Sequence, residues 1–114
     1  MNTPWQVVCQ SDELTETGPG VRFTIGQSAE PGFVIRIAGQ TRAFINRCGH
    51  VPVELDWPEG SFMDDERHYI RCATHGAIYD PHTGACQGGP CRGRGLTALQ
   101  CTERNGQVLV ARSA

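Results

Sequence analysis

Two short segments of the sequence each pair one cysteine with one histidine. Cys48 and His50 lie in RCGHVPVEL, and Cys72 and His75 lie in RCATHGAIYD. Side chains two residues apart in an extended loop point the same way, so Cys48 and His50 can converge on one site. A tight turn, closed behind His75 by Gly76, brings Cys72 and His75 together. Two thiolates and two imidazoles suit a metal centre that prefers soft or borderline ligands.

Two kinds of metal centre fit these four residues. A structural zinc site of the Cys₂His₂ type usually takes its cysteines from one short segment and its histidines from another, whereas each segment here is mixed. In a two-iron cluster each segment gives one ligand to each iron. Cys48 and Cys72 would then hold one iron and His50 and His75 the other, as in Rieske centres. Ligand chemistry leaves both open, and the mixed pairing favours the cluster.

The exchange of two thiolates for imidazoles changes the charge of such a cluster. Two ferric ions and two sulfides carry a charge of +2, so four thiolates give −2, whereas two thiolates and two neutral imidazoles give 0. An added electron is therefore easier to accommodate in a partly buried site. The expected reduction potential rises into the range of about −150 to +300 mV.

The segments that must position these ligands are short and β-like. Aromatic and β-branched residues gather in runs between turn residues, and Phe33, Ile35 and Ile37 alternate as on one face of a strand. Asn105-Gly106 favours a two-residue hairpin turn, and no run of ten or more residues keeps a helical period. The predicted strands are Trp5–Cys9, Val21–Ile25, Phe33–Ala38, Thr41–Asn46, His68–Cys72, Ala77–Tyr79, Leu99–Arg104 and Gln107–Arg112.

These patterns predict a single all-β domain with two parts. The chain of 114 residues is long enough for one core. Residues 1–46 and 96–114 are expected to form the base, a small β-sandwich or barrel. Residues 47–95 have shorter strands and longer loops and include both Cys/His segments, so we expect a loop-rich, cluster-binding subdomain there.

Charge and hydropathy exclude several classes of protein. The net charge of −2 and the pI of about 6.0 provide no overall field for nucleic acid. No window approaches the roughly 18 apolar residues of a membrane-spanning helix, and the first residues lack the basic and apolar regions of a secretory signal. We therefore expect a cytoplasmic protein, whose six cysteines favour metal binding or burial over a disulfide framework.

Beyond the ligand segments, the sequence resembles the soluble Rieske-type [2Fe–2S] ferredoxins. HGAIYDPHTGACQGGPC is similar to the second ligand loop, short strand and proline loop of that family, and CRGRGLTAL to the strand that returns to the base. The resemblance implies a Rieske-like fold and one [2Fe–2S] cluster per chain. It also implies that a loop containing Pro90 covers the cluster and that Tyr79 donates a hydrogen bond to a ligand sulfur.

The sequence departs from the high-potential members of that family at three places. Their two loops are joined by a disulfide, and Val53 and Thr74 stand at the corresponding positions here. A serine that donates to a bridging sulfide is replaced by Ala77, whereas Tyr79 is retained. Fewer hydrogen bonds to sulfur stabilise the reduced cluster less, so we expect a potential below the high-potential class.

The remaining four cysteines are not expected to bind the cluster. Cys9 and Cys101 lie on predicted strands and fit small core residues. Cys86 and Cys91 flank the proline loop, where a disulfide would brace it. A reducing cytosol favours free thiols, and the sequence leaves the state of this pair open.

The sequence shows no arrangement of catalytic residues, which predicts an electron-transfer component that is not an enzyme by itself. The resemblance implies a one-electron carrier between a reductase and an oxygenase or similar oxidoreductase, and we expect a monomer. One alternative is a small subunit of a permanent oxidoreductase complex, similar to the small subunits of nitrite reductases. Another is a zinc-stabilised interaction module.

Overall fold

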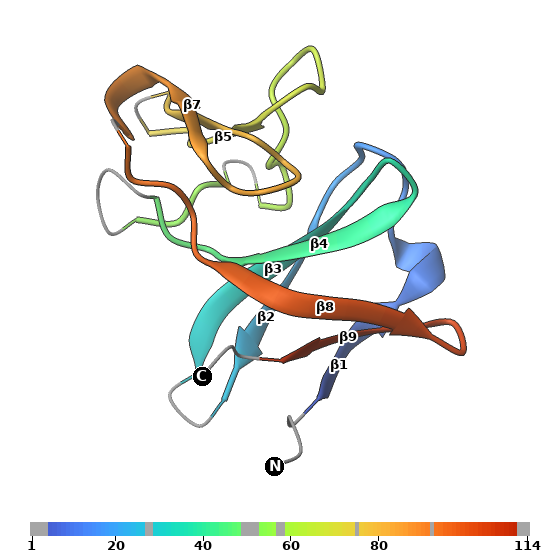
Figure 1. Ribbon diagram of the computed structural model, residues 1–114. Helices are drawn as coiled ribbons and strands as arrows, with labels where there is room; N and C mark the ends of the chain where they lie inside the picture. The colour runs from blue at the N-terminus through green and yellow to red at the C-terminus, as the bar shows by residue number, and fades with distance from the viewer. Residues whose placement is uncertain are drawn as a thin grey trace.

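The structure, a computed structural model, describes residues 5–26, 29–48, 53–56, 59–74, 76–91 and 93–111. Two antiparallel sheets make up the fold, a six-stranded base and a three-stranded sheet above it (Figure 1). The elements in chain order are β1 (Gln6–Gln10), η1 (Ser11–Glu13), β2 (Val21–Ile25), β3 (Glu30–Ile37), β4 (Gln40–Ile45), β5 (Ile70–Arg71), β6 (Ile78–Tyr79), β7 (Cys86–Gly88), η2 (Gly89–Cys91), β8 (Ala98–Arg104) and β9 (Gln107–Ala111).

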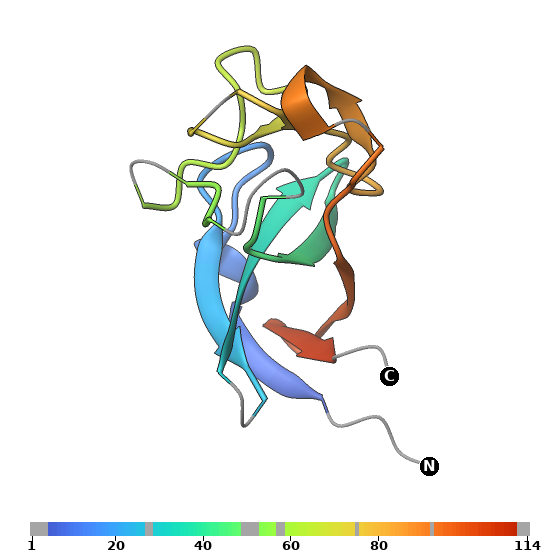
Figure 2. The same ribbon diagram turned by 90° about the vertical axis from the view of Figure 1, so that its left-hand side faces the viewer.

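The base sheet has the strand order β1-β9-β8-β4-β3-β2 and curls until its two edges meet (Figure 2). The side-chain amide of Gln6 in β1 donates a 2.8 Å hydrogen bond to the carbonyl of Thr24 in β2. This bond links the edge strands of a nearly closed, barrel-like sheet. The predicted all-β class with a barrel-like base is confirmed.

Two hydrophobic cores lie on opposite faces of β3. Val34 faces the barrel interior together with Val108 and Val110. Phe33 and Ile35 belong to a second core, which also contains residues of the three-stranded part. The alternation expected for Phe33, Ile35 and Ile37 is therefore present, and this face of β3 supports the upper sheet.

The two-residue turns that join β3 to β4 and β8 to β9 use positive backbone φ angles. Asn105 and Gly106, between β8 and β9, have φ of 54° and 76°, as expected of a two-residue hairpin turn. Ala38 and Gly39 connect β3 and β4 with φ of 51° and 75°. The Glu16 carboxylate accepts hydrogen bonds from both amides of the latter turn, at 2.6 and 2.8 Å.

The long segment before the second Cys/His loop forms a hairpin-like excursion that is anchored to the base. Met63 and Ile70 form an antiparallel bridge. At the tip, the Asp64 carboxylate accepts hydrogen bonds from the amides of His68 and Tyr69. At its root the Phe62 ring stacks on Phe33, with centroids 3.9 Å apart and planes at 10°.

The predicted strands of the described chain are all present, with ends that differ by at most three residues and with β2 matched at both ends. The strand β7 was not predicted, because its sequence Cys-Gln-Gly lacks aromatic and β-branched residues. Within the described ranges, no helix has the length and apolarity needed to cross a membrane.

Candidate metal centre

The loops of the two predicted cysteine ligands are closed by the same kind of backbone hydrogen bond. The amide of Cys48 donates to the carbonyl of Val53 at 2.7 Å, and the amide of Cys72 donates to the carbonyl of Ala77 at 2.9 Å. Each cysteine is thus bonded to the residue five positions later. A further bond, from Ala73 N to Leu55 O at 2.9 Å, ties the second loop directly to the first.

Both cysteine side chains lie in the core between the base and the upper sheet. Cys48 is 5% exposed and Cys72 is fully buried, and neither is in a disulfide. His50 and His75, the other two predicted ligands, lie outside the described residues. Among the described residues no group of three or more metal-binding side chains is assembled, and Cys48 and Cys72 belong to one hydrophobic core.

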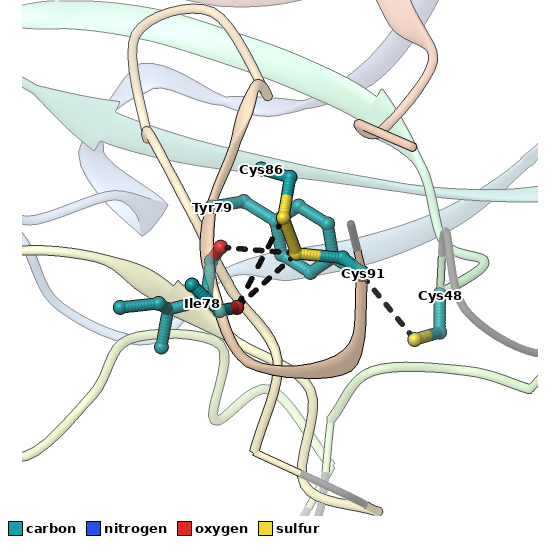
Figure 3. Close-up of a disulfide and its surroundings, with 6 residues drawn as sticks. Cys48, Ile78, Tyr79, Cys86 and Cys91 are labelled. Carbon is teal, nitrogen blue, oxygen red and sulfur yellow. Dashed lines mark hydrogen bonds between the residues drawn. A yellow bond between two sulfur atoms is a disulfide. The ribbon is translucent and has the colours of Figure 1, made fainter. Parts of the chain in front are cut away.

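Tyr79 points its hydroxyl at the first of these cysteines. It is fully buried on β6, and its Oη lies 3.3 Å from the Sγ of Cys48. Figure 3 shows the two side chains with the hydrogen bond drawn between them. Either group could donate; a metal-bound Cys48 thiolate would accept the hydrogen bond from the phenol. The predicted contact between Tyr79 and a candidate ligand sulfur is therefore present.

The predicted proline loop packs against the second cysteine loop. Gly89 and Pro90 lie in η2, and Gly89 has a φ of +78°. A Cβ at Gly89 would lie 3.0 Å from Ala77 Cα and 3.1 Å from Gly76 O. Glycine is thus required by both the backbone angle and the close approach. Gly76, for its part, has a φ of +77° and donates to Cys72 O at 2.9 Å, which closes the expected turn.

Cys86 and Cys91, whose state the sequence left open, form a disulfide (Figure 3). It encloses the Gly88-Gly89-Pro90 segment. Cys91 is 1% exposed, whereas Cys86 is partly exposed. A reducing compartment generally favours free thiols, but this pair is oxidised in the structure.

A buried polar network, which the sequence did not reveal, positions the first cysteine loop. Asn46 is 1% exposed; it accepts a hydrogen bond from Leu55 N at 2.9 Å and donates to Asp56 Oδ1 at 3.1 Å. The other Asp56 oxygen accepts from Gly60 N at 2.8 Å and lies 3.6 Å from Arg22 Nε. The only sequence signal was a polar residue at the end of a strand, two positions before Cys48.

Cys9 lies in the barrel core and Cys101 packs against it, as expected of small core residues. Burial, reinforced by the negative charge of Glu13, raises the pKa of Cys9 to about 11. Burial also raises the pKa of Cys101, whose thiol donates to Thr41 Oγ1 at 3.2 Å. Their raised pKa values favour the protonated thiols.

The described donor set fits an iron–sulfur centre. Two cysteines converge from adjacent loops into a shared apolar core, and a hydroxyl is directed at one sulfur. Thiolate ligands, a hydrogen bond to sulfur and restricted solvent access are what such clusters require. The remaining two ligands would come from His50 and His75.

Comparison with known proteins agrees with this geometry. A family model described as the Rieske [2Fe-2S] domain matches residues 4–107. Among curated proteins no sequence matches.

The structure is also similar to solved structures of a dioxygenase system. The ferredoxin of carbazole 1,9a-dioxygenase from Nocardioides aromaticivorans IC177 has a TM-score of 0.75 and 25% identity, over 97% of this chain and all of that one. A complex of reduced oxygenase and oxidized ferredoxin in carbazole 1,9a-dioxygenase contains a chain with a TM-score of 0.78 and 26% identity, over 96% of this chain and 94% of that one.

The terminal oxygenase from the same Nocardioides strain shares the fold. It gives a TM-score of 0.80 with 20% identity, but this chain spans only 31% of the oxygenase chain. Two further carbazole 1,9a-dioxygenase structures are matched over 29% and 28% of their chains.

Proposed function

Since the chain belongs to the Rieske [2Fe-2S] domain family, we propose that it is a one-electron carrier that delivers electrons to an oxygenase or a similar oxidoreductase. The observation that carries the proposal is the pair of buried cysteines, on loops of identical closure, with the Tyr79 hydroxyl directed at one of them. When bound, the [2Fe–2S] cluster supplies one-electron redox chemistry.

We assign the cluster ligands as two pairs. Cys48 and Cys72 hold one iron, supported by their burial in one core and by the bond that joins their loops. His50 and His75 hold the other iron, an assignment supported by their spacing from these cysteines in the sequence. Residues 47–95 then act as the cluster-binding subdomain on a base formed by residues 1–46 and 96–114.

The surrounding residues of this chain set the properties of the site. The Tyr79 hydroxyl donates to the Cys48 sulfur and stabilises negative charge there. Gly76 closes the second loop, and the loop containing Pro90 lies against it and limits the access of water. Ala77 has no hydroxyl to add a further hydrogen bond, which supports a potential below the high-potential class.

The proposed partners are a reductase and a terminal oxygenase. Similarity over nearly full length to a ferredoxin of carbazole 1,9a-dioxygenase supports an oxygenase as the electron acceptor. We propose that the protein acts as a monomer and transfers electrons without transforming a substrate itself. Co-elution with a partner oxidoreductase at unit stoichiometry throughout purification would instead indicate a permanent subunit.

Metal content and spectroscopy test the proposed function. We expect about two irons and two labile sulfides per chain, and an EPR signal of the reduced protein with an average g below that of all-cysteine clusters. His50→Cys and His75→Cys, where a cluster assembles, should each lower the reduction potential because they add negative charge. His68→Cys, on the exposed hairpin tip, is the matched control and should leave it unchanged. A folded, colourless protein that contains zinc and no iron would refute the proposal.

A further inference from the structure

We propose that the Cys86–Cys91 disulfide is a clasp that holds the proline loop against β6 and so keeps the Tyr79 hydroxyl aligned with the Cys48 sulfur. The clasp is a positioning device for the electron-carrying site, and the inference rests on the proposed function. Neither cysteine is a ligand. Their effect on the site would be exerted through Tyr79.

The strand register places the disulfide beside Tyr79. In the β6–β7 pair, Cys86 lies opposite Tyr79, and the pairing shifts by one residue so that Ile78 lies opposite Gly88. Directly opposed residues of an antiparallel pair project from the same face of the sheet. Cys91 Sγ lies 3.7 Å from Ile78 O and 3.2 Å from Gly88 O. The disulfide thus lies beside the strand that carries Tyr79 (Figure 3).

Within the described residues, the strand pairing next to the proline loop is short. The strand β6 has two residues and β7 has three, and a register shift interrupts their pairing. Gly89 packs closely on Gly76 and Ala77, a contact that contains no hydrogen-bonding side chain. A covalent link between the two ends of a six-residue segment removes the alternative positions of that segment.

The rest of this hairpin does not depend on the disulfide. Asp80 N donates to Ala85 O at 2.8 Å, Gly84 N donates to Asp80 O at 2.7 Å, and Leu96 N donates to Gly84 O at 2.8 Å. These bonds form the turn before β7 and join it to the chain that returns to the base. Opening the clasp should therefore release the loop of residues 86–91 without unfolding the hairpin.

Release of the loop would weaken the hydrogen bond between the Tyr79 hydroxyl and the Cys48 sulfur. A hydrogen bond in a dry, low-dielectric core is electrostatically stronger than one in contact with water. With the loop displaced, water reaches the pair and competes for both the hydroxyl and the sulfur. Loss of the Tyr79 hydroxyl and loss of the clasp should therefore have non-additive effects on the reduction potential.

The test is a set of four cluster-loaded proteins: wild type, Tyr79→Phe, the double variant Cys86→Ser/Cys91→Ser, and the triple variant. Midpoint potentials are measured by voltammetry and cluster type by EPR. The disulfide in the wild type is confirmed by mass spectrometry after alkylation. Cys101→Ser, which removes a thiol from the barrel, is the matched control and should leave the potential unchanged.

With the clasp present, Tyr79→Phe should lower the equilibrium constant for reduction of the cluster about tenfold, which is about 59 mV for one electron. In the double variant the same substitution should change it less than about threefold. An equal effect of Tyr79→Phe in both backgrounds, or free Cys86 and Cys91 thiols in the purified wild type, would overturn the inference. An all-cysteine EPR signal or an iron-free wild type would overturn the proposed function instead.

Amide hydrogen exchange provides a readout that does not require the cluster. In the cluster-free wild type and double variant, the amides of residues 78, 79 and 86–88 should exchange faster when the clasp is open, whereas those of β8 and β9 should not change. If the double variant fails to bind the cluster, unchanged exchange in β6 and β7 still overturns the inference.

Discussion

Replacement of Phe62 by alanine should lower the free energy of unfolding more than the replacement of any exposed residue in the same hairpin. The reason is that Phe62 joins the upper sheet to the base. The Phe62 ring is 1% exposed and stacks on Phe33 of β3, which itself packs against Phe44 with centroids 5.7 Å apart. The carbonyl of Phe62 also accepts a 2.8 Å hydrogen bond from the amide of Arg71. Phe62 thus connects the ring stack to β5, the strand that leads into Cys72.

The size of the effect can be derived from burial and ring stacking. Removal of a fully buried phenylalanine side chain costs about 3–5 kcal/mol, because apolar burial is lost and a cavity remains. Phe62→Leu retains most of the buried area and loses chiefly the ring contact, which contributes about 0.5–1.5 kcal/mol. A domain of this size is stable by about 5–15 kcal/mol, so the alanine variant loses a large part of its stability.

Equilibrium unfolding of the cluster-loaded protein in guanidinium chloride, followed by circular dichroism, measures these differences. Tyr69→Ala is the matched control, since Tyr69 is on the same excursion but is 37% exposed; it should change stability by less than about 0.5 kcal/mol. Combining Phe62→Leu with Phe33→Leu should give a coupling energy above about 0.5 kcal/mol. If Phe62→Ala costs no more than Tyr69→Ala, the stack does not anchor the subdomain.

Three further predictions concern the base and the metal. Arg36 donates two hydrogen bonds to Glu103, at 3.0 and 2.8 Å, which lower the pKa of that carboxyl. The stability it contributes is present above its ordinary pKa and is lost as pH falls through the lowered value. Glu103→Gln should therefore cost about 1 kcal/mol at pH 7 and progressively less in acid, as thermal unfolding across pH would show. Ala38→Asn should raise the free energy of unfolding by about 1 kcal/mol in denaturant titrations, because asparagine tolerates the positive φ at this turn; no gain would contradict the strain argument. Removal of iron with a chelator should speed amide exchange at Arg71 more than at Val110, which lies in the separate barrel core; equal acceleration would argue against two separable cores.

Much of the base could be predicted because its signals are local. The alternation of Phe33, Ile35 and Ile37 needs only a period of two, and Asn105-Gly106 specifies its turn by backbone angle. The spacing of Cys48 and Cys72 predicted that they share a site, and the family resemblance singled out Tyr79; the structure places all three in one core. The assignment of His50 and His75 as ligands still rests on the sequence, because both lie outside the described residues.

The features that escaped prediction depend on contacts between distant residues. In the sequence, Asn46 is an ordinary polar residue at the end of a strand. Its role depends on hydrogen bonds with Leu55 and Asp56, which only the fold brings close to it. The strand β7 has no propensity signal and forms because β6 is available as a partner. Nor does the spacing of Cys86 and Cys91 determine their redox state. Their side chains come together because the glycine-rich segment between them turns sharply at Gly89.

The strand β3 contributes side chains to both hydrophobic cores, which explains how a small fold can support a rigid site on loops. Its odd-numbered residues Phe33 and Ile35 fill the core that contains Cys48, Cys72 and Tyr79, while Val34 fills the barrel. Because the side chains of a strand alternate in direction, displacement of β3 would disturb both cores at once. The cysteine loops therefore rest on a strand whose position is fixed from its opposite side, and the short strands β5, β6 and β7 do not need to be stable alone.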